Sequence, residues 1–426
     1  MYQTKDLKEQ VKNGQLDERL EMIYVDTKMI SGQRGRYEQA IAEFEKLFGE
    51  GEAEIYSAPG RSEVGGNHTD HQYGKVLAAS VNLDAIAVVR KTEDNQIQLL
   101  SEGYPMINVD LAELDAKKEE EGTSKGLIRG VAQGLAKNGH AIGGFQAYVT
   151  SDVLGGAGLS SSAAFEVLVG TILSGLYNDM SIDAVEIAKV GQYAENVYFG
   201  KPCGLLDQMA CSVGGLIHID FKDKEHPVVE KVDVDFAAYD HSLCITDTKG
   251  SHANLTDEYA AVPAEMKQVA GYFGKNVLRE VEIPEFYGAI AELREKFGDR
   301  PVLRAIHFFT ENARVEKQVA ALQEGKFDEF LQLIKESGNS SFKYLQNVYT
   351  SKDVQSQAVS IGLAVSESIL TGHGVSRVHG GGFAGTIQAF VKNDFVEEYR
   401  KTLDSVYGEG SCHVLKVRPV GGVKVV

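Results

Sequence analysis

The sequence predicts an α+β fold, because strand-like runs and helical periodicity both recur along the chain. Apolar runs of strand type occur in the first half, for example at 76–81 and 85–89. Apolar residues at helical spacing dominate from Glu258 to about Leu370, with a break near 298–301. A chain of 426 residues is long enough for two or three domains, each with its own core.

The order of the segments suggests where the chain divides. Residues 1 to about 50 show helical spacing, and 53–60 is typical of a strand that ends in a turn. Strand-like runs return at 216–221 and 242–246. We place the boundary between these two runs, which gives domains 1–225 and 226–426.

The composition excludes several classes of protein. With 43% hydrophobic and 24% charged residues, the chain is typical of soluble globular proteins. A formal net charge of -18 argues against a nucleic-acid partner or an anionic membrane. The four cysteines form no CxxC pair, and no apolar run resembles a signal peptide or a membrane span. We therefore expect a cytoplasmic protein with reduced thiols.

A glycine- and serine-rich stretch, 154–166, is the feature with the clearest chemistry. It follows a strand-like run at 145–150 and precedes apolar residues at helical spacing. Free backbone N–H groups and the helix dipole make such a junction an anion site. The pattern predicts a phosphate loop, although the Gly-Lys-Ser/Thr of a Walker A motif is absent. A serine-capped helix after a flexible turn is the alternative interpretation.

An unusually polar stretch, 61–74, lies between two apolar strand-like runs. Its Arg, Asn, His and Asp side chains suit a polyhydroxyl ligand, which needs many donors and acceptors. An ordinary polar loop would have the same composition. Metal binding by His68, Asp70 and His71 is disfavoured, because their spacing is not that of the His-Glu-x-x-His helix.

Three further features gain meaning only in combination. Glu195 lies in a helical pattern, where an acidic residue usually faces solvent and has no further role. Asp207 follows a Gly-Lys-Pro segment, and the simpler interpretation is that it caps a helix. Near the C-terminus, Gly380, Gly382 and Gly385 match G-x-G-x-x-G, but a strand-like run follows where a dinucleotide fold needs a helix.

The order of these motifs is specific. The chain runs from Pro59-Gly60-Arg61 and His68-Thr69-Asp70 to 155–163, then to Cys203-Gly204-Leu205-Leu206-Asp207-Gln208 and Gly380-Gly381-Gly382-Phe383. This resembles the galactokinases of the GHMP small-molecule kinase superfamily. The resemblance covers most of the chain and includes 304–307 and 311–314 in the second half.

The resemblance implies a two-domain GHMP kinase fold with the active site in the cleft between the domains. It implies ATP-dependent phosphorylation of the anomeric hydroxyl of a sugar, most simply galactose, with Mg²⁺ as cofactor. Small-molecule sugar and ATP would be the only partners implied. The implied roles are catalysis by Asp207 and Arg61; sugar binding by Asn67, His68, Asp70 and Gly204; triphosphate binding by Gly155, Gly156, Gly158, Ser160, Ser161 and Ser162; and Mg²⁺ binding by Ser162 and Glu195.

The chain departs from the family pattern at two places. The family signature reads Arg-Val-Asn-Leu-Ile-Gly-Glu-His-Thr-Asp-Tyr, and this chain has Asn67 where the signature has its glutamate. That change removes a negative charge near C6 of the sugar, and 70–72 resembles plant galacturonokinases. The chain also has Ala253 in place of the tyrosine in the family's Ser-x-Tyr-Asn, and Tyr259 is the candidate substitute.

Two alternatives to a galactose kinase remain. The first is a kinase for galacturonate or another galactose-like sugar. The second is a sensor that binds sugar and ATP without turnover, as some members of the family do. An enzyme is favoured, because a sensor does not need all of the residues implied in catalysis and Mg²⁺ binding. The chain retains all four of them, Arg61, Ser162, Glu195 and Asp207.

Overall fold

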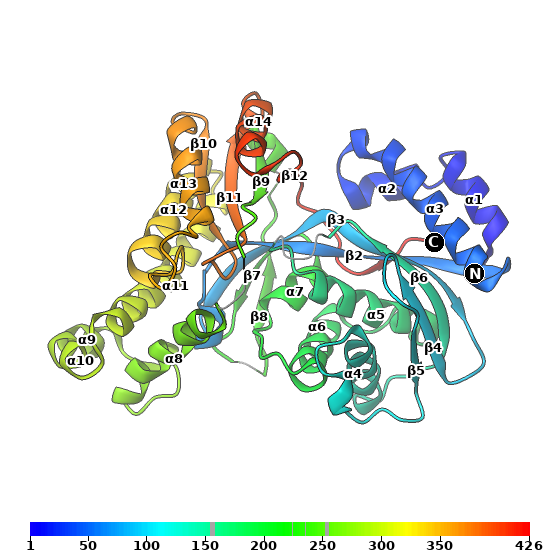
Figure 1. The fold of residues 1–426 in the computed structure, drawn as a ribbon, viewed down its shortest axis with the longest axis horizontal. Coiled ribbons are helices and arrows are strands. Elements are labelled where there is room, and N and C mark those ends of the chain that lie inside the picture. Colours follow the sequence, from blue (N-terminus) through cyan, green and yellow to red (C-terminus); the bar gives the residue numbers. More distant parts are fainter. Residues whose placement is uncertain (154–157, 224, 235, 252–254) are drawn as a thin grey trace.

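Two sheets and the helices around them make up the protein, shown in Figure 1. The structure is a computed structural model that describes residues 1–426 except 154–157, 224, 235 and 252–254. Gly155, Gly156 and Ala253 therefore lie outside the described residues. No helix within the described ranges is long and apolar enough to cross a membrane.

The first sheet holds nine of the described strands, built around one long hairpin. Strands β2 (Glu52–Gly65) and β3 (Lys75–Lys91) form the hairpin, and the order β1-β2-β3-β6-β4-β5 continues from it. The other members are β1 (Tyr2–Gln3), β4 (Gln96–Ser101), β5 (Ile107–Asp110), β6 (Phe145–Ser151), β7 (Leu216–Asp220), β8 (Val228–Lys231) and β13 (Val423–Lys424). Strand β7 pairs with the start of β3, and β13 pairs with β2.

Helices cover both faces of this sheet, as Figure 1 shows. The N-terminal helices α1 (Thr4–Lys12), α2 (Asp17–Tyr24) and α3 (Ile30–Phe48) pack on Ile55, Ile86 and Val88. On the opposite face, Ala58, Ala87 and Val89 join a core with α4 (Ser124–Lys137), α5 (Ser161–Asn178) and α6 (Ala184–Tyr193). Alternate residues of β2 and β3 thus enter different cores, and burial on both faces explains their nearly continuous apolar sequence.

The prediction that the strand at 53–60 ends in a turn is wrong. Strand β2 continues to Gly65, with register shifts between Pro59 and Arg61 and between Glu63 and Gly65. Proline has no N–H to give to the ladder, so it is tolerated at such an irregularity. After the first shift Arg61 pairs with Ser80 of β3, and its backbone N–H donates to the Leu159 carbonyl, in the loop before α5, at 3.0 Å.

The second sheet is antiparallel in the order β10-β11-β9-β12. Its strands are β9 (His241–Asp247), β10 (Gly374–His379), β11 (Thr386–Lys392) and β12 (Cys412–Leu415). The helices of this half are α8 (Thr256–Tyr272), α9 (Ile283–Gly288), α10 (Ile290–Phe297), α11 (Asp299–Gln323), α12 (Phe327–Ser340), α13 (Ala358–Ile369) and α14 (Val396–Tyr407). The predicted helical break near 298–301 falls between α10 and α11.

The division into domains 1–225 and 226–426 stays a prediction. Strand β8 still pairs with β7 in the first sheet, and β9 begins the second sheet. We propose that the chain crosses from one half to the other between β8 and β9. The largest apolar cluster joins the two halves, since it contains Leu77 of β3 together with Leu243 and Phe390 of the second sheet.

Asp84 ties three distant segments together inside the first half. Its buried carboxylate accepts hydrogen bonds from Arg36 at 2.6 Å, Arg418 at 3.1 Å and Tyr24 at 3.0 Å, and also from Ser57. Burial alone would raise the pKa of Asp84, but the two guanidinium groups outweigh it and hold the pKa below its usual value.

Asp84→Asn should lower the free energy of unfolding by about 3–5 kcal/mol, because it leaves Arg418 buried without a counter-charge and Arg36 with Asp152 alone. The measurement is urea denaturation at pH 7. Lys46→Ala, which removes the exposed Lys46–Glu43 pair, is the control and should cost less than about 1 kcal/mol. An equal effect of the two substitutions would contradict the role assigned to Asp84.

Candidate active site

The predicted motifs meet at a cavity of about 270 Å³ between the two halves of the chain. The first half supplies the end of β2, the loop before α5 and the start of α7 (Leu206–Val213). The second half supplies α8 and the loop from β10 to β11. The lining residues are Arg61, Gly158, Ser160, Ser161, Ser162, Lys201, Asp207, Tyr259, His379, Gly380, Gly381, Gly382, Ala384, Gly385 and Thr386.

Asp207 and Arg61 form a bidentate ion pair at the wall of this cavity. Arg61 Nε donates to Asp207 Oδ1 at 2.7 Å, and Arg61 Nη2 donates to Oδ2 at 2.8 Å. Ser160 Oγ also donates to Oδ2. Burial alone would raise the pKa of Asp207, but the Arg61 charge and these hydrogen bonds hold the pKa below its usual value. Asp207 is the second residue of α7 and not its N-cap, so the simpler reading of this acid is wrong.

The loop before α5 approaches the second half closely. Gly158 has φ +68°, and a side chain there would come within 2.4 Å of Thr386 Oγ1. Ser160 is the N-cap of α5 and also has a left-handed backbone, with φ 57°. Ser161 and Ser162 open the helix, and no acidic residue lies in its first turn. The free N–H groups and the dipole of α5 therefore face the cavity, and no acidic residue of the helix's own first turn competes for them.

Glu195 and Ser162 are hydrogen-bonded to each other at the start of α5. Ser162 Oγ donates to Glu195 Oε1 at 3.3 Å, and Lys201 Nζ lies 3.2 Å from the same oxygen. Glu195 belongs to a π-helical turn, 194–199, which follows α6 and brings the buried carboxylate to the cavity edge. Within the described residues no group of three His, Cys, Asp or Glu side chains could hold a metal ion.

These two oxygens nevertheless fit Mg²⁺. Magnesium prefers hard oxygen ligands and is often bound by one or two protein groups together with phosphates and water. Lys201 is the group that would have to give way, and its side chain is 63% exposed and free to move.

A second buried carboxylate, Glu166, supports Glu195 from within the protein. Gln208 Nε2 donates to Glu195 Oε2 at 2.8 Å and to Glu166 Oε2 at 3.0 Å. Burial and the charge of Glu195 raise the pKa of Glu166, so this acid is neutral at pH 7. Gln208 thus fixes the orientation of Glu195 without a second negative charge beside it.

Asp70 and Gly204, two of the residues expected to bind the sugar, lie against each other but do not line this cavity. A Cβ atom at position 204 would clash with Asp70 Oδ2 in its present position, so glycine allows this close approach. Burial, with a smaller contribution from the charge of Asp207, raises the pKa of Asp70 to about 6. Nearby, His68 Nε2 lies 3.0 Å from the Gly381 carbonyl oxygen, and burial lowers the pKa of His68 to about 4.

Asn67 is buried, and its amide is fully occupied by the protein. Its Nδ2 donates to Glu63 Oε1 at 3.0 Å and to the Gly380 carbonyl at 2.7 Å. Its Oδ1 accepts from Ser341 at 3.1 Å and from Asn347 at 2.9 Å. The family signature quoted above has asparagine and glutamate at the positions of Glu63 and Asn67, so the chain has exchanged the two. The carboxylate is retained at Glu63, where Arg377 donates to it at 2.6 Å.

Helix α11 holds the loop that carries Asn67 and Asp70. His307 Nε2 lies 2.9 Å from the Asn67 carbonyl oxygen, and the Gly66 N–H donates to Glu311 at 3.1 Å. These contacts give a positioning role to the two second-half segments, 304–307 and 311–314, that the sequence resemblance included.

A larger cavity of about 600 Å³ adjoins the first on the other side of the α5 start. The two share Ser161 and Ser162. The larger one has an apolar wall that includes Leu127, Val149 and Phe165, with Tyr104 and Lys125 also lining it. This cavity was not predictable from sequence, because its lining comes from six separate segments with no shared motif.

Three further cavity residues were missed or left open by the sequence. Lys201 was not singled out, although a lysine between Glu195 and Asp207 in an acidic chain is a usable signal. His379 Nε2 accepts from the Glu63 N–H at 3.2 Å, and burial with nearby Arg61 and Arg377 lowers its pKa, so its ring is neutral. Tyr259 lines the cavity and donates to the Gly382 carbonyl at 2.8 Å.

Two family models match the chain. The galactokinase galactose-binding signature matches residues 42–91, and the N-terminal domain of GHMP kinases matches residues 126–215. The galactokinase of Streptomyces coelicolor is 29% identical over 379 residues, which cover 88% of this chain and 94% of that protein. The galactokinase of Clostridium tetani is also 29% identical, over 86% of this chain and 91% of that protein.

Solved structures agree with this assignment. Lactococcus lactis galactokinase, determined in complex with galactose, is 27% identical, has a TM-score of 0.77, and matches over 90% of this chain and 98% of its own. Methanococcus jannaschii mevalonate kinase shares the fold at 16% identity, with a TM-score of 0.61 over 86% of this chain and 99% of its own. Together these matches confirm the GHMP kinase fold expected from the motif order, and they show that the chain is similar to galactokinases over most of its length.

Proposed function

We propose that this chain phosphorylates the anomeric hydroxyl of galactose with ATP, giving galactose 1-phosphate and ADP. One observation supports this most strongly: a carboxylate kept ionised by an arginine lies at the same cavity as a helix start fit to bind phosphate. Phosphoryl transfer depends mainly on positioning and charge stabilisation, and this arrangement provides both.

In the proposed mechanism Asp207 orients the 1-hydroxyl toward the γ-phosphorus. Because its pKa is low, Asp207 is a weak base, and it accepts the hydroxyl proton late, as the new O–P bond forms and the bond to ADP breaks. Arg61 holds Asp207 in place and stabilises charge on the transferring group. Asp70, His68 and the backbone at Gly204 bind the sugar from the other end of the site.

ATP would lie along the start of α5. Ser161, Ser162, Gly158 and the backbone N–H groups would bind the phosphates, with Lys201 adding a positive charge. The 600 Å³ cavity, with its apolar wall, is the proposed place for the base. Ser162 and Glu195 would hold Mg²⁺, which supplies neutralisation of the phosphate charge when bound. Gly155 and Gly156 remain proposed phosphate contacts on the sequence alone.

The contacts of Asn67 favour galactose over galacturonate. The arguments for galacturonate were the lost negative charge at position 67 and the resemblance of 70–72 to plant galacturonokinases, and the structure bears on the first. The neighbouring Glu63 keeps a carboxylate 3.0 Å from Asn67 Nδ2, and the Asn67 amide has no hydrogen-bonding capacity left for a sugar group. We therefore propose that Asn67 positions the loop and does not contact the sugar. Tyr259 is proposed to take the place of the missing tyrosine at Ala253, because it lines the cavity with Asp207.

The direct test is ATP consumption by the purified protein with galactose and, separately, with galacturonate. We expect turnover of galactose, and Asp207→Asn should lower kcat by about a thousandfold or more because it removes both the proton acceptor and the partner of Arg61. Turnover of galacturonate alone would overturn the choice of sugar. Binding of both sugar and ATP without turnover would favour the sensor.

The pH dependence tests Asp70. A pKa raised to about 6 means that Asp70 is protonated at pH 5 and ionised at pH 7, so KM for galactose should fall as the pH rises through 6. Asp70→Asn should raise KM and abolish this dependence, while the effects of ATP ionisation remain in both proteins. The measurement is KM for galactose from pH 5 to 8 at saturating ATP. An unchanged profile in the variant would exclude Asp70 as the titrating group.

Glu195→Gln tests the metal site. Loss of the carboxylate should raise the Mg²⁺ concentration for half-maximal rate by about tenfold or more, because a neutral amide is a poorer ligand for a hard divalent cation. Glu119→Gln makes the same chemical change at an exposed acid without an ion pair among the described residues, and should leave the Mg²⁺ curve unchanged. Coincident curves for all three proteins would contradict the assignment of Glu195.

A further inference from the structure

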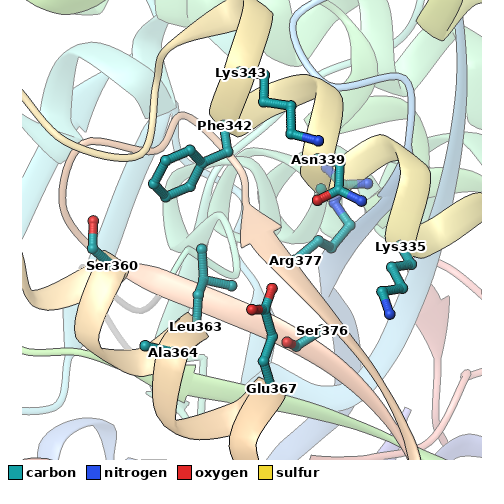
Figure 2. Close-up of a pocket in the computed structure, with 11 residues that line it drawn as sticks. Lys335, Asn339, Phe342, Lys343, Ser360, Leu363, Ala364, Glu367, Ser376 and Arg377 are labelled. Atoms are coloured by element: carbon teal, nitrogen blue, oxygen red, sulfur yellow. The ribbon is translucent and has the colours of Figure 1, made fainter. Parts of the chain in front are cut away.

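A third cavity, of about 330 Å³, lies in the second half and shares no lining residue with the two at the active site. It is formed by α12, the π-helical turn 341–345, α13 and β10, and Figure 2 shows its side chains. It is lined by Lys335, Gly338, Asn339, Phe342, Lys343, Ser360, Leu363, Ala364, Glu367, Ser376 and Arg377. The catalytic proposal makes no use of it.

Positive charge gathers on one wall of this cavity. Lys335, Asn339 and Lys343 recur at four-residue spacing, so they share one face of α12 and its continuation. Neither lysine forms an ion pair within the described ranges, although the chain carries a net charge of -18 and acids are plentiful. Glu367 is the single acid in the lining, and the deeper Arg377 is already neutralised by Glu63.

The floor of the cavity offers a hydrogen-bonding group that the protein does not use. Ser376 is 8% exposed, lines the cavity, and its Oγ has no hydrogen-bond partner within the described residues. Ser360 Oγ, on the α13 side, is also buried without a partner there. A buried hydroxyl without a partner is costly, so an oxygen-rich ligand that hydrogen-bonds to it would be favoured.

The remaining wall is apolar. Leu363 is 8% exposed and Phe342 is 43% exposed, and Figure 2 shows the Phe342 ring on the same side of the cavity as Leu363. A bare inorganic ion would leave this wall in water, whereas a molecule with an anionic end and an apolar body would cover it.

We propose that this cavity is a second ligand site, which binds a small phosphate monoester with an apolar body. The two lysines would pair with the phosphate, which carries close to two negative charges at neutral pH, and the serine hydroxyls would donate to its oxygens. The body of the ligand would lie against Phe342 and Leu363. The site is independent of the catalytic proposal, because its residues take no part in phosphoryl transfer.

The test is isothermal titration calorimetry of the full chain with phenyl phosphate as the probe. We expect saturable binding to the wild-type protein and at least tenfold weaker binding to Lys335→Met/Lys343→Met. Lys317→Met/Lys401→Met removes two other exposed lysines and should bind like the wild type. Ser376→Ala should weaken binding severalfold. If phenyl phosphate bound at the loop before α5 instead, its affinity would be the same for the wild type and for both cavity variants. Unchanged affinity in these variants would therefore overturn the proposal.

Two further probes separate the parts of the ligand. Inorganic phosphate should bind at least fivefold more weakly than phenyl phosphate, since it cannot cover the apolar wall, and phenol should show no saturable binding. Absence of saturable phenyl phosphate binding, or equal binding of phenol, would overturn the site. Equal binding of inorganic phosphate would overturn the assignment of an apolar body. The thermal midpoints of the variants, which should match the wild type, check that they are folded.

Discussion

The Arg61–Asp207 ion pair is the interaction on which the active site depends. Its three elements are the end of β2, the loop before α5 and the start of α7, because Arg61 also donates to the Gly158 carbonyl. Arg61 is buried and would be costly without a counter-charge, so its pairing with Asp207 holds these elements in their relative positions. The register shift between Pro59 and Arg61 sets the position of this residue in the hairpin, where it pairs with Ser80 of β3.

The order of motifs in the sequence predicted the fold family and most of the cavity lining. Gly158, Ser160–Ser162 and Asp207 reach one cavity from segments that are far apart in the chain, and the glycine loop 380–382 closes it. Local pattern indicated the glycine-rich junction and the helix start, and the resemblance of the motif order to galactokinases joined them to Asp207.

Residues whose role depends on tertiary partners were not predictable. Asn67 lies in the signature and was expected to contact sugar, yet Ser341, Asn347 and the Gly380 carbonyl, all distant in sequence, occupy its amide. Glu166 and Gln208 are ordinary helix residues until burial brings them beside Glu195. The continuation of β2 beyond Pro59 was also not predictable, because a proline followed by a glycine is as typical of a turn as of an irregularity within a strand.

The exchange of Glu63 and Asn67 constrains how relatives with the two arrangements can be connected by descent. Replacing Asn67 first would put two carboxylates against each other in a buried site, and replacing Glu63 first would leave the Arg377 guanidinium without its counter-charge. Either chain with a single replacement would be less stable than the chain with both residues exchanged and the chain with neither exchanged. The two positions therefore behave as one inherited unit, and comparing either of them alone between relatives misreads a compensated pair as a change of specificity.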